Sequence, residues 1–333
     1  MLLKKLWRTI GVYRAQFLSM ILMIAIGVGI FVAFNMEWKS IEKNTDSLFR
    51  ATGYADFRVV SETGSAFSAE DRDKIAAIEG VGAVSRFVSV AVKVAERDNT
   101  VALTVTENEN VSGMLLRAGA AYDKNDIGGI WLSDKYAEAN DVAVGDTLTL
   151  TYEGTEFRGT VRGLVKSGEY LVCVPESGGQ IMPDFHKHGF AFISPAWYAE
   201  VTRTRVAAVK AAATATAAAA ATGADAESDA YRDAYRTAYD SAYSATYDAI
   251  GDHADIAYYA QVHVQSGMEK KAFSEAVNHA LGRTSLILSR DESASYAAAK
   301  GESEEGKTMA LILPVLFLLI AVLTMVTTMH RLV

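Results

Sequence analysis

The chain has 333 residues, with 4 prolines, 1 cysteine and a formal net charge of −8, which is enough length for one or two domains with a hydrophobic core. The charge is unevenly placed. Residues 1–36 contain no carboxylate, and Arg331 is the one formally charged residue of 309–333. The segment between them carries 27 cationic and 40 carboxylate side chains. A net charge of −13 in that segment argues against nucleic-acid binding, and a single cysteine excludes an intrachain disulfide.

Two apolar runs lie at the acid-poor ends. Residues 17–34 contain 18 residues without a charge, and residues 309–329 contain 21. An α-helix needs about 20 residues to cross about 30 Å of hydrocarbon, so we expect transmembrane helices at 17–35 and 309–329. Buried helices of a soluble protein are the alternative for both, although such helices seldom lack a polar face. A cleaved signal peptide is an alternative for the first run, but Asn35-Met36-Glu37 offers no small-residue cleavage site.

Cationic residues next to these runs predict the topology. Lys4, Lys5, Arg8 and Arg14 precede the first run, so residues 1–16 are expected in the cytoplasm, and Arg331 predicts that residues 330–333 return there. The sequence therefore predicts a multi-pass protein of the cell (plasma) membrane with a large extracytoplasmic domain.

The first half of that domain has a pattern of strand, helix, strand and strand. After the first run the helix is expected to continue outward until Gly53 ends it, followed by a strand in 54–61. Residues 68–80 predict a short helix with Ser68 as N-cap and Gly80 as terminator. Two alternating runs, 86–96 and 101–107, are separated by "RDNT" and predict an antiparallel hairpin.

The same pattern resumes further along. Ser133 can cap a short helix, Glu153-Gly154 can turn two strands into a hairpin within 144–167, and 188–194 adds a strand. Residues 256–266, 268–282 and 284–290 then read as strand, helix and strand. The fold class expected is an α+β extracytoplasmic domain between two transmembrane α-helices, with segments 36–195 and 253–308 forming one mostly antiparallel sheet with packed helices.

An alanine- and tyrosine-rich segment, 196–252, interrupts the domain. Its tyrosines recur every fourth residue, so on a helix they form one slowly winding stripe. Alanine is the best helix former, and Gly223 supplies a break, so we expect an inserted helical hairpin. A self-packed hairpin inserted in a loop is favoured over an arm that touches a partner or substrate. The stripe consists of Tyr231, Tyr235, Tyr239, Tyr243 and Tyr247.

"GESEEGKT", residues 301–308, fits the phosphate-loop consensus G-x-x-x-x-G-K-[ST] with Gly301, Gly306, Lys307 and Thr308. Such a loop follows a buried strand, whereas "ASYAAAK" before it reads as helix and three of its four variable positions are glutamates. The surroundings favour an exposed, acidic lead into the second transmembrane helix, with Lys307 at the membrane interface.

Other candidate sites carry weak signals. Asp184, His186 and His188 could begin a metal site, but the sequence offers no further ligand, and a polar loop is favoured. Cys173 is expected to be a small buried thiol. We therefore predict no catalytic, cofactor-binding or metal-binding residue, and no enzyme activity.

The ends and the domain together resemble a known family. "LILPVLFLLIAVLTMVTTMHRLV", preceded by "EEGKTM", resembles the second transmembrane segment of FtsX-like ABC-transporter permeases, which also resemble the MacB class of exporters. "RAQFLSMILMIAIGVGIFVAFN" is similar to their first segment, and "LSDKYAEANDVAVGDTLTLTYEGTEFRGTVRGLVKSGEY" to the core of their periplasmic domain. The resemblance covers about residues 1–195 and 255–333, and the tyrosine-rich hairpin is not a general feature of the family.

The resemblance implies a membrane permease subunit that binds a separate cytoplasmic ABC ATPase, with long helices moving the extracytoplasmic domain for export or cell-envelope work. Family members continue past the position of Val333 into further transmembrane helices, so we expect an N-terminal half that needs the remaining permease half or a second permease subunit. A two-span sensor or adhesion protein with an extracytoplasmic ligand-binding domain is the rival function.

Overall fold

The computed structural model describes residues 8, 10–62, 66–95, 97–152, 154–175, 182–220, 228–250 and 261–332. The chain divides into two compact units. One is a helix pair, Met1–Ser47 with Ala297–Val333, and the other is a globular unit, Leu48–Tyr296.

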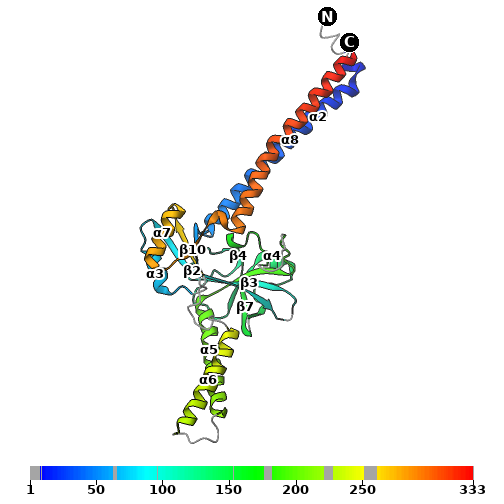
Figure 1. Ribbon diagram of the computed structural model, residues 1–333. Coiled ribbons are helices and arrows are strands. Elements are labelled where there is room, and N and C mark those ends of the chain that lie inside the picture. Colours follow the sequence, from blue (N-terminus) through cyan, green and yellow to red (C-terminus); the bar gives the residue numbers. More distant parts are fainter. Residues whose placement is uncertain are drawn as a thin grey trace. The chain divides into compact units, whose positions relative to one another are not determined.

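The helix pair consists of the two longest helices. Helix α2, Arg14–Ala51, has 38 residues, and helix α8, Ala294–Leu332, has 39. The two helices run side by side (Figure 1). At 1.5 Å per residue each is about 57 Å long, nearly twice the thickness of a bilayer's hydrocarbon core. Both apolar runs therefore continue as helix beyond the length that a membrane requires, as the sequence predicts.

A single ten-stranded sheet forms the centre of the globular unit, in the order β10-β1-β9-β2-β3-β8-β5-β7-β4, with β6 pairing to β2 and β7. Among the described residues, all pairings are antiparallel except β3 with β8 and β5 with β7, so the expectation of a mostly antiparallel sheet is confirmed. The strands are β1 Phe57–Ser61, β2 Val81–Val94, β3 Thr100–Thr106, β4 Leu115–Gly119, β5 Gly129–Ser133, β6 Thr147–Tyr152, β7 Thr155–Lys166, β8 His188–Ile193, β9 Gln261–Ser266 and β10 Ser285–Ser289.

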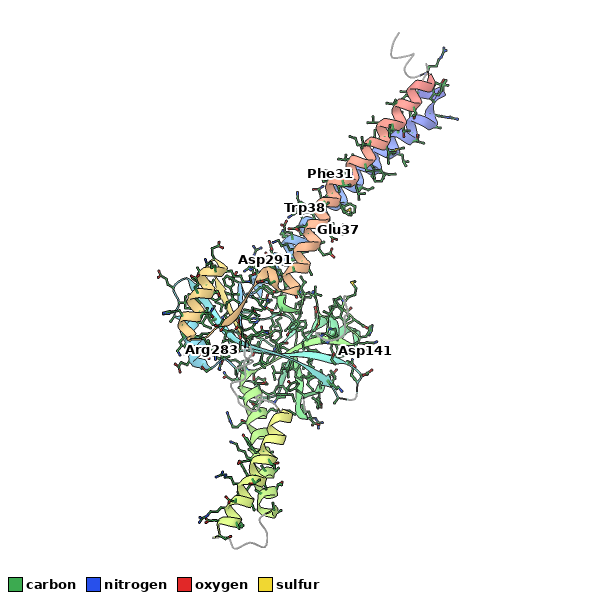
Figure 2. The ribbon with its side chains drawn as sticks, viewed as in Figure 1. Phe31, Glu37, Trp38, Asp141, Arg283 and Asp291 are labelled. Carbon is green, nitrogen blue, oxygen red and sulfur yellow. The ribbon has the colours of Figure 1, made fainter. Side chains whose placement is uncertain are left out.

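Short helices cover the sheet in two places. Helix α3, Ala69–Ala76, and helix α7, Lys270–Leu281, pack on β1, β9 and β10, where alternate strand residues such as Val59, Val262 and Val264 are fully buried. Arg283, labelled in Figure 2, follows α7, and its Nη2 atom lies 3.0 Å from Oδ2 of Asp71, which links the end of α7 to α3. Helix α4, Asp134–Ala139, and the start of α5 cover a second core formed by β2, β3 and β5–β8.

Most local predictions are confirmed. Ser68 and Ser133 accept the capping hydrogen bonds of α3 and α4, and β2 pairs with β3 as expected. Two expectations need correction. Helix α3 ends at Ala76 rather than at Gly80, because Ala77 already closes its last turn and Gly80, with φ of 87°, turns the chain into β2. Strand β4 was not expected, since its exposed LLRAG sequence lacks the alternation of a half-buried strand.

The inserted segment forms the expected helical hairpin. Helices α5, Pro195–Ala220, and α6, Asp229–Ile250, run side by side and extend away from the sheet (Figure 1). Ala213 and Ala217 are buried between them, and the first four stripe tyrosines stack along α6 with ring centroids 5.8–6.4 Å apart. Gly223 lies outside the described residues. The fold class is therefore α+β between two apolar helices, with an alanine- and tyrosine-rich hairpin.

We expect the hairpin to be dispensable for folding. Trp197 and Tyr198, in the first turn of α5, belong to the sheet core, but the buried alanines beyond them pack within the hairpin. Replacing residues 207–250 by a glycine-serine linker should leave the thermal unfolding midpoint of the globular unit within a few degrees, equivalent to about 1 kcal/mol or less. Loss of a cooperative transition in the deleted protein would show instead that the tyrosine stripe is part of the core.

Candidate functional site

The two long helices contact each other along one narrow seam. Seam positions recur every three or four residues on both helices, as in a coiled coil, so most of the apolar surface of each helix faces outward. The seam residues are Phe17, Met20, Met23, Gly27, Ile30, Phe34, Trp38 and Ile41 of α2, with Ser303, Gly306, Ala310, Leu313, Phe317, Ala321 and Thr324 of α8. Small residues at several of these positions allow close approach, as is common between membrane helices.

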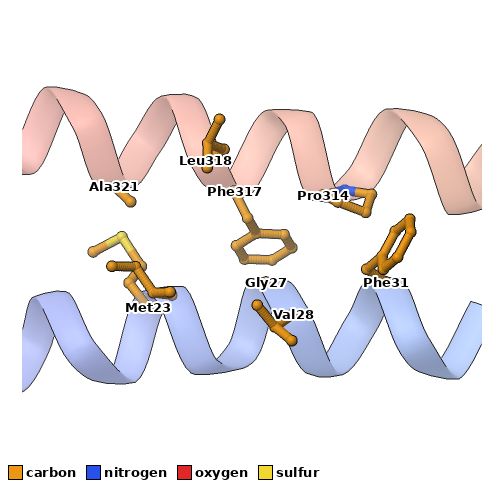
Figure 3. Close-up of a pocket in the computed structure, with 9 residues that line it drawn as sticks. Met23, Gly27, Val28, Phe31, Pro314, Phe317, Leu318 and Ala321 are labelled. Carbon is orange, nitrogen blue, oxygen red and sulfur yellow. The ribbon is translucent and has the colours of Figure 1, made fainter.

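An apolar groove of about 260 Å³ lies within the seam (Figure 3). Gly27 provides the close contact beside it, because a Cβ atom there would lie 3.2 Å from the Cβ of Phe317. Pro314 lines the other side and cannot donate a backbone hydrogen bond within α8. No lining side chain carries a hydroxyl, amide or charged group, so the groove is suited to alkyl or aromatic groups. The lining residues are Met23, Ile24, Gly27, Val28 and Phe31 with Pro314, Phe317, Leu318 and Ala321.

A polar contact follows further along the same seam, near Glu37 and Trp38 of α2 (Figure 2). The Nζ atom of Lys307 lies 3.1 Å from Oε1 of Glu42 and 4.8 Å from the ring centre of Trp38. Gly306 gives Trp38 its space, since a Cβ atom there would lie 2.7 Å from the Cβ of Trp38. Gly306 and Lys307 therefore connect the two helices, while the Thr308 hydroxyl donates to Glu304 within α8. They lie inside α8, where backbone N–H groups bond to the preceding turn rather than to a phosphate.

We expect Lys307→Ala to leave nucleotide behaviour unchanged. The purified full chain should show no saturable ATP binding before or after the substitution, because the motif lacks a loop. Since Lys307 and Glu42 are each 44% exposed, the substitution should also weaken the helix pair by no more than about 1 kcal/mol. A double-mutant cycle with Glu42→Ala measures that coupling, and ATP binding abolished by Lys307→Ala would contradict the assignment.

A cluster of mostly buried polar and aromatic side chains surrounds the last turn of α2 and the first turn of α8, and we call it the joint. It joins strands β1 and β9, the 3₁₀ helix η1, Gly168–Tyr170, and the loop that follows β3. Its members are Phe49, Tyr54, Arg58, Ser112, Glu169, His263, Ser293, Ser295 and Tyr296.

Aromatic rings and one hydrogen bond connect the two helix ends. The ring of Phe49 lies 4.5 Å from that of Tyr54 and 5.4 Å from that of Tyr296. The hydroxyl groups of Tyr54 and Ser293 are hydrogen-bonded. The chain therefore enters the globular unit from α2 and leaves it into α8 at one shared cluster.

A buried ion pair lies at the centre of the joint. Arg58 donates from Nη2 to Glu169 at 2.6 Å and to the Tyr54 hydroxyl at 2.8 Å, and the two charged side chains are 10% and 9% exposed. Burial disfavours the guanidinium cation, but Glu169 and Tyr54 outweigh that effect and raise the pKa of Arg58. Ser295, at the start of α8, donates to the carbonyl oxygen of Glu169 at 2.7 Å. One glutamate thus contacts both β1 and α8.

The loop after β3 is fixed against the end of α2. The amide of Ser112 donates to Gly53, and that of Gly113 donates to Thr52, each at 2.8 Å. Ser112 adopts a left-handed backbone with φ of 50°, which is uncommon for a residue other than glycine. In this conformation its Oγ atom lies 2.7 Å from Oε1 of Glu169.

His263 completes the joint from β9. Strand register places it directly opposite Arg58, and its side chain is 1% exposed. Its Nδ1 atom lies 2.6 Å from Oγ of Ser112, and the ring stacks on Phe87 with centroids 4.0 Å apart. Burial, together with the charge of Arg58, lowers the pKa of His263 well below its usual value.

Serine, histidine and glutamate are the residue types of a hydrolase triad, but this geometry is different. In a triad the carboxylate binds the far nitrogen of the histidine, whereas Glu169 binds Ser112, and Nε2 of His263 faces Gln261 at 3.1 Å. Ser112 is also only 1% exposed, so a substrate has no access to its hydroxyl. The joint is therefore suited to holding elements together rather than to covalent catalysis.

The sequence-based candidates lie apart from the joint, except for Cys173. His186 is exposed and His188 is buried against Thr100, and Asp184 accepts from the amide of His186. Among the described residues no group of three or more possible metal ligands occurs. Cys173 is buried as expected, and burial raises the pKa of its thiol to about 12.

Sequence reasoning missed the joint, although two signals were present. Arg58 and His263 each interrupt a run of apolar residues, in FRVVS and QVHVQS, at positions where alternation turns them away from the valine-rich core. A polar residue on the second face of a strand normally indicates solvent. That this face is covered by the ends of α2 and α8 depends on the tertiary fold.

The chain is similar to known proteins over most of its length. The family model described as MacB-like periplasmic core domain matches residues 17–227. The extracellular domain of the noncanonic ABC-type transporter YknZ from Gram-positive bacteria is 12% identical, with a TM-score of 0.37, over 71% of this chain and 98% of that chain. The periplasmic region of MacB from Actinobacillus actinomycetemcomitans is 11% identical, with a TM-score of 0.36, over 77% of this chain and 95% of that chain. No curated protein matches the chain significantly.

Proposed function

Because the chain belongs to the family of the MacB-like periplasmic core domain, we propose that it is the N-terminal half of an FtsX-like ABC-transporter permease. In this proposal a separate cytoplasmic ABC ATPase hydrolyses ATP, and the chain, which is not itself an enzyme, converts that work into movement of its extracytoplasmic domain for export or cell-envelope work. The remaining permease half or a second permease subunit completes the membrane part.

The family resemblance expected from the sequence is confirmed by the match over residues 17–227. The chain is accordingly a member of a membrane permease family, with two apolar helices flanking an extracytoplasmic domain of periplasmic type. Coupling to ATP hydrolysis, the direction of transport and the partners go beyond this membership and are proposals.

The observation that carries the proposal is helix continuity. Helices α2 and α8 each run without a break from an apolar segment into the joint, and the seam holds them together along their length. A continuous helix transmits a tilt or shift at one end to the other, as in hinge and shear motions of other proteins. Both connections to the globular unit converge on one ion pair, so movement of the helices would act on the domain at one place.

We also propose that residues 1–16 and 330–333 are cytoplasmic, that 17–35 and 309–329 span the membrane, and that 36–195 with 253–308 form the domain into which 196–252 is inserted. In a Cys173→Ser background, single cysteines near Lys4 or after Met329 should resist an impermeant thiol reagent in intact cells. A cysteine near Asp225 should react. Labelling near Lys4 from outside would invert the proposed topology.

The coupling itself can be tested in proteoliposomes that contain the full chain, the remaining permease half and the co-encoded ATPase. Trp38→Cys with Gly306→Cys should form a disulfide across the seam when the helices separate by about 1 Å, since the two Cβ positions are 2.7 Å apart and the Cβ atoms of bridged cysteines lie about 3.8 Å apart. When that disulfide is reduced, we expect the distance between a label in the globular unit and a label in α8 to change with the bound nucleotide. An ATPase that neither copurifies with the chain nor changes that distance would contradict the proposal.

A further inference from the structure

The hydrogen bonds of the joint leave a proton to be assigned. The Ser112 hydroxyl has one hydrogen but faces two groups, Oε1 of Glu169 at 2.7 Å and Nδ1 of His263 at 2.6 Å. A carboxylate paired with Arg58 can only accept, so Ser112 donates to Glu169. The Ser112 oxygen must then accept from Nδ1–H of His263.

This assignment fixes the opposite side of the imidazole ring. If His263 is neutral and carries its proton on Nδ1, its Nε2 atom is an acceptor and requires a donor, which the amide NH₂ of Gln261 can supply. If His263 is protonated on both nitrogens, Nε2 donates and requires the amide oxygen of Gln261, which lies 3.1 Å away. In the structure Oε1 of Gln261 faces Nε2, and rotation of the amide about its Cγ–Cδ bond brings the NH₂ group to the same place, so the two orientations of one amide serve the protonated and the neutral ring.

We propose that His263, Ser112 and Gln261 form an acid-sensitive latch that keeps the ends of α2 and α8 fastened to the sheet at neutral pH and releases them as the pH falls. In the closed latch His263 is neutral. The Ser112 hydroxyl then holds Glu169 through a hydrogen bond, and the carbonyl oxygen of Glu169 holds Ser295 at the start of α8 through another. The inference concerns the globular unit and holds for any partner or transported substrate.

The surroundings of His263 favour the neutral ring when the latch is closed. Arg58 faces it from β1 and repels a second cation, while Glu169 from η1 lies 3.8 Å from Nδ1 and its charge is shared with Arg58. Ser85 lies opposite on β2, and Phe87 on the same strand covers the ring, so the imidazole is only 1% exposed to solvent. Burial first, and Arg58 second, depress the pKa of the ring.

The direction of the pH effect follows from that depression. Opening the latch returns His263 to solvent and to an ordinary pKa of about 6.5, so the open state binds more protons than the closed state below that pH. The population of the open state should rise about tenfold as the pH falls from 7.5 to 5.5. It should rise about tenfold again for each further unit of fall until the ring of the closed state titrates. Carboxylates in ordinary surroundings remain ionised through the upper part of this range, which isolates the histidines.

Cys173 supplies a natural reporter of opening. It is the only cysteine in the chain, it is 1% exposed, and the neighbouring amide of Val172 donates to Ser295 in the joint. The full chain in nanodiscs would be treated with a dipyridyl disulfide, and the reaction rate divided by that of the urea-unfolded chain at the same pH. This ratio cancels the pH dependence of the thiol itself. Its inverse is the protection of Cys173 from the reagent.

We expect protection to fall about tenfold from pH 7.5 to 5.5 in the unmodified chain and to stay constant in His263→Asn. An asparagine amide occupies the place of Nδ1 and can donate to Ser112 but cannot take up a proton. His188→Asn is the matched control, because His188 is also buried and its pKa is also lowered by burial, yet it lies on β8 away from Ser112. That variant should keep the response of the unmodified chain.

A second variant covers the case in which His263→Asn fails to fold. Gln261→Glu offers a permanent acceptor to Nε2, so it should stabilise the protonated ring within the closed latch and flatten the same response. Protection that does not change with pH in the unmodified chain, a full response that persists in Gln261→Glu, or a response lost in His188→Asn would each overturn the proposal.

Discussion

Replacing Glu169 by alanine is expected to lower the free energy of unfolding of the globular unit by about 3–5 kcal/mol, because removal of one partner leaves a buried charge unpaired. Arg58 would keep its guanidinium, 10% exposed and raised in pKa by its present partners, and of the acceptors in the described part of the chain Tyr54 alone would remain. Ser112 would lose its acceptor at the same time. Urea unfolding of the full chain in detergent micelles, followed by tryptophan fluorescence, measures the change.

The matched control is another ion pair of similar length on the surface. Lys135 and Glu138 lie 2.8 Å apart but are 53% and 73% exposed, so Glu138→Ala should leave the unfolding midpoint unchanged. Arg58→Met combined with Glu169→Leu should be less damaging than Glu169→Ala, since a buried pair can often be exchanged for apolar side chains. Equal effects of Glu169→Ala and Glu138→Ala would show that the joint does not hold the unit together.

The parts of the fold that follow from local chemistry were predictable from the sequence. Ser68 caps α3 because its hydroxyl and the carboxylate of Asp71 satisfy each other's backbone amides, and that pattern is visible as S-x-x-D. The helical hairpin likewise follows from alanine content and tyrosine spacing. In each case the cause lies within one turn of the residue concerned.

The joint could not be predicted in this way because its members are far apart in the chain. Ser112 and His263 are separated by 151 positions, and Tyr54 and Ser293 by 239. Each looks unremarkable in its own segment: a serine in a loop, a polar residue on a strand. Only the strand order, which places β9 between β1 and β2, brings these residues beneath the ends of α2 and α8.

The GKT motif shows the opposite limitation, because its residues match a consensus that the fold does not use. Gly306 is present at a close helix contact and Lys307 pairs with Glu42, so both residues have a structural reason to be there. A glycine followed by a lysine satisfies a phosphate loop and a helix seam equally well. The periodicity of the surrounding helix distinguishes the two, and the four-letter match does not.

Gly53→Ala is expected to destabilise the joint far more than the same change at Gly282, although both glycines follow helices and have nearly equal φ angles. Gly53 has φ of 59° and Gly282 has φ of 66°, so alanine costs about 1–2 kcal/mol at either position through the left-handed conformation alone. A Cβ atom on Gly282 meets nothing within 4 Å, whereas one on Gly53 would overlap the carbonyl of Asn110.

That overlap cannot be relieved by a side-chain rotation, because the obstructing atoms belong to the backbone of the loop that carries Ser112. The carbonyl of Gly53 accepts from the Ser112 amide, so moving the loop away breaks that bond and withdraws the Ser112 hydroxyl from Glu169. We therefore expect Gly53→Ala to cost at least about 3 kcal/mol in urea unfolding and Gly282→Ala about 1–2 kcal/mol. Equal costs would mean that the loop yields freely, in which case the contacts between α2, Ser112 and Glu169 do not act as one unit.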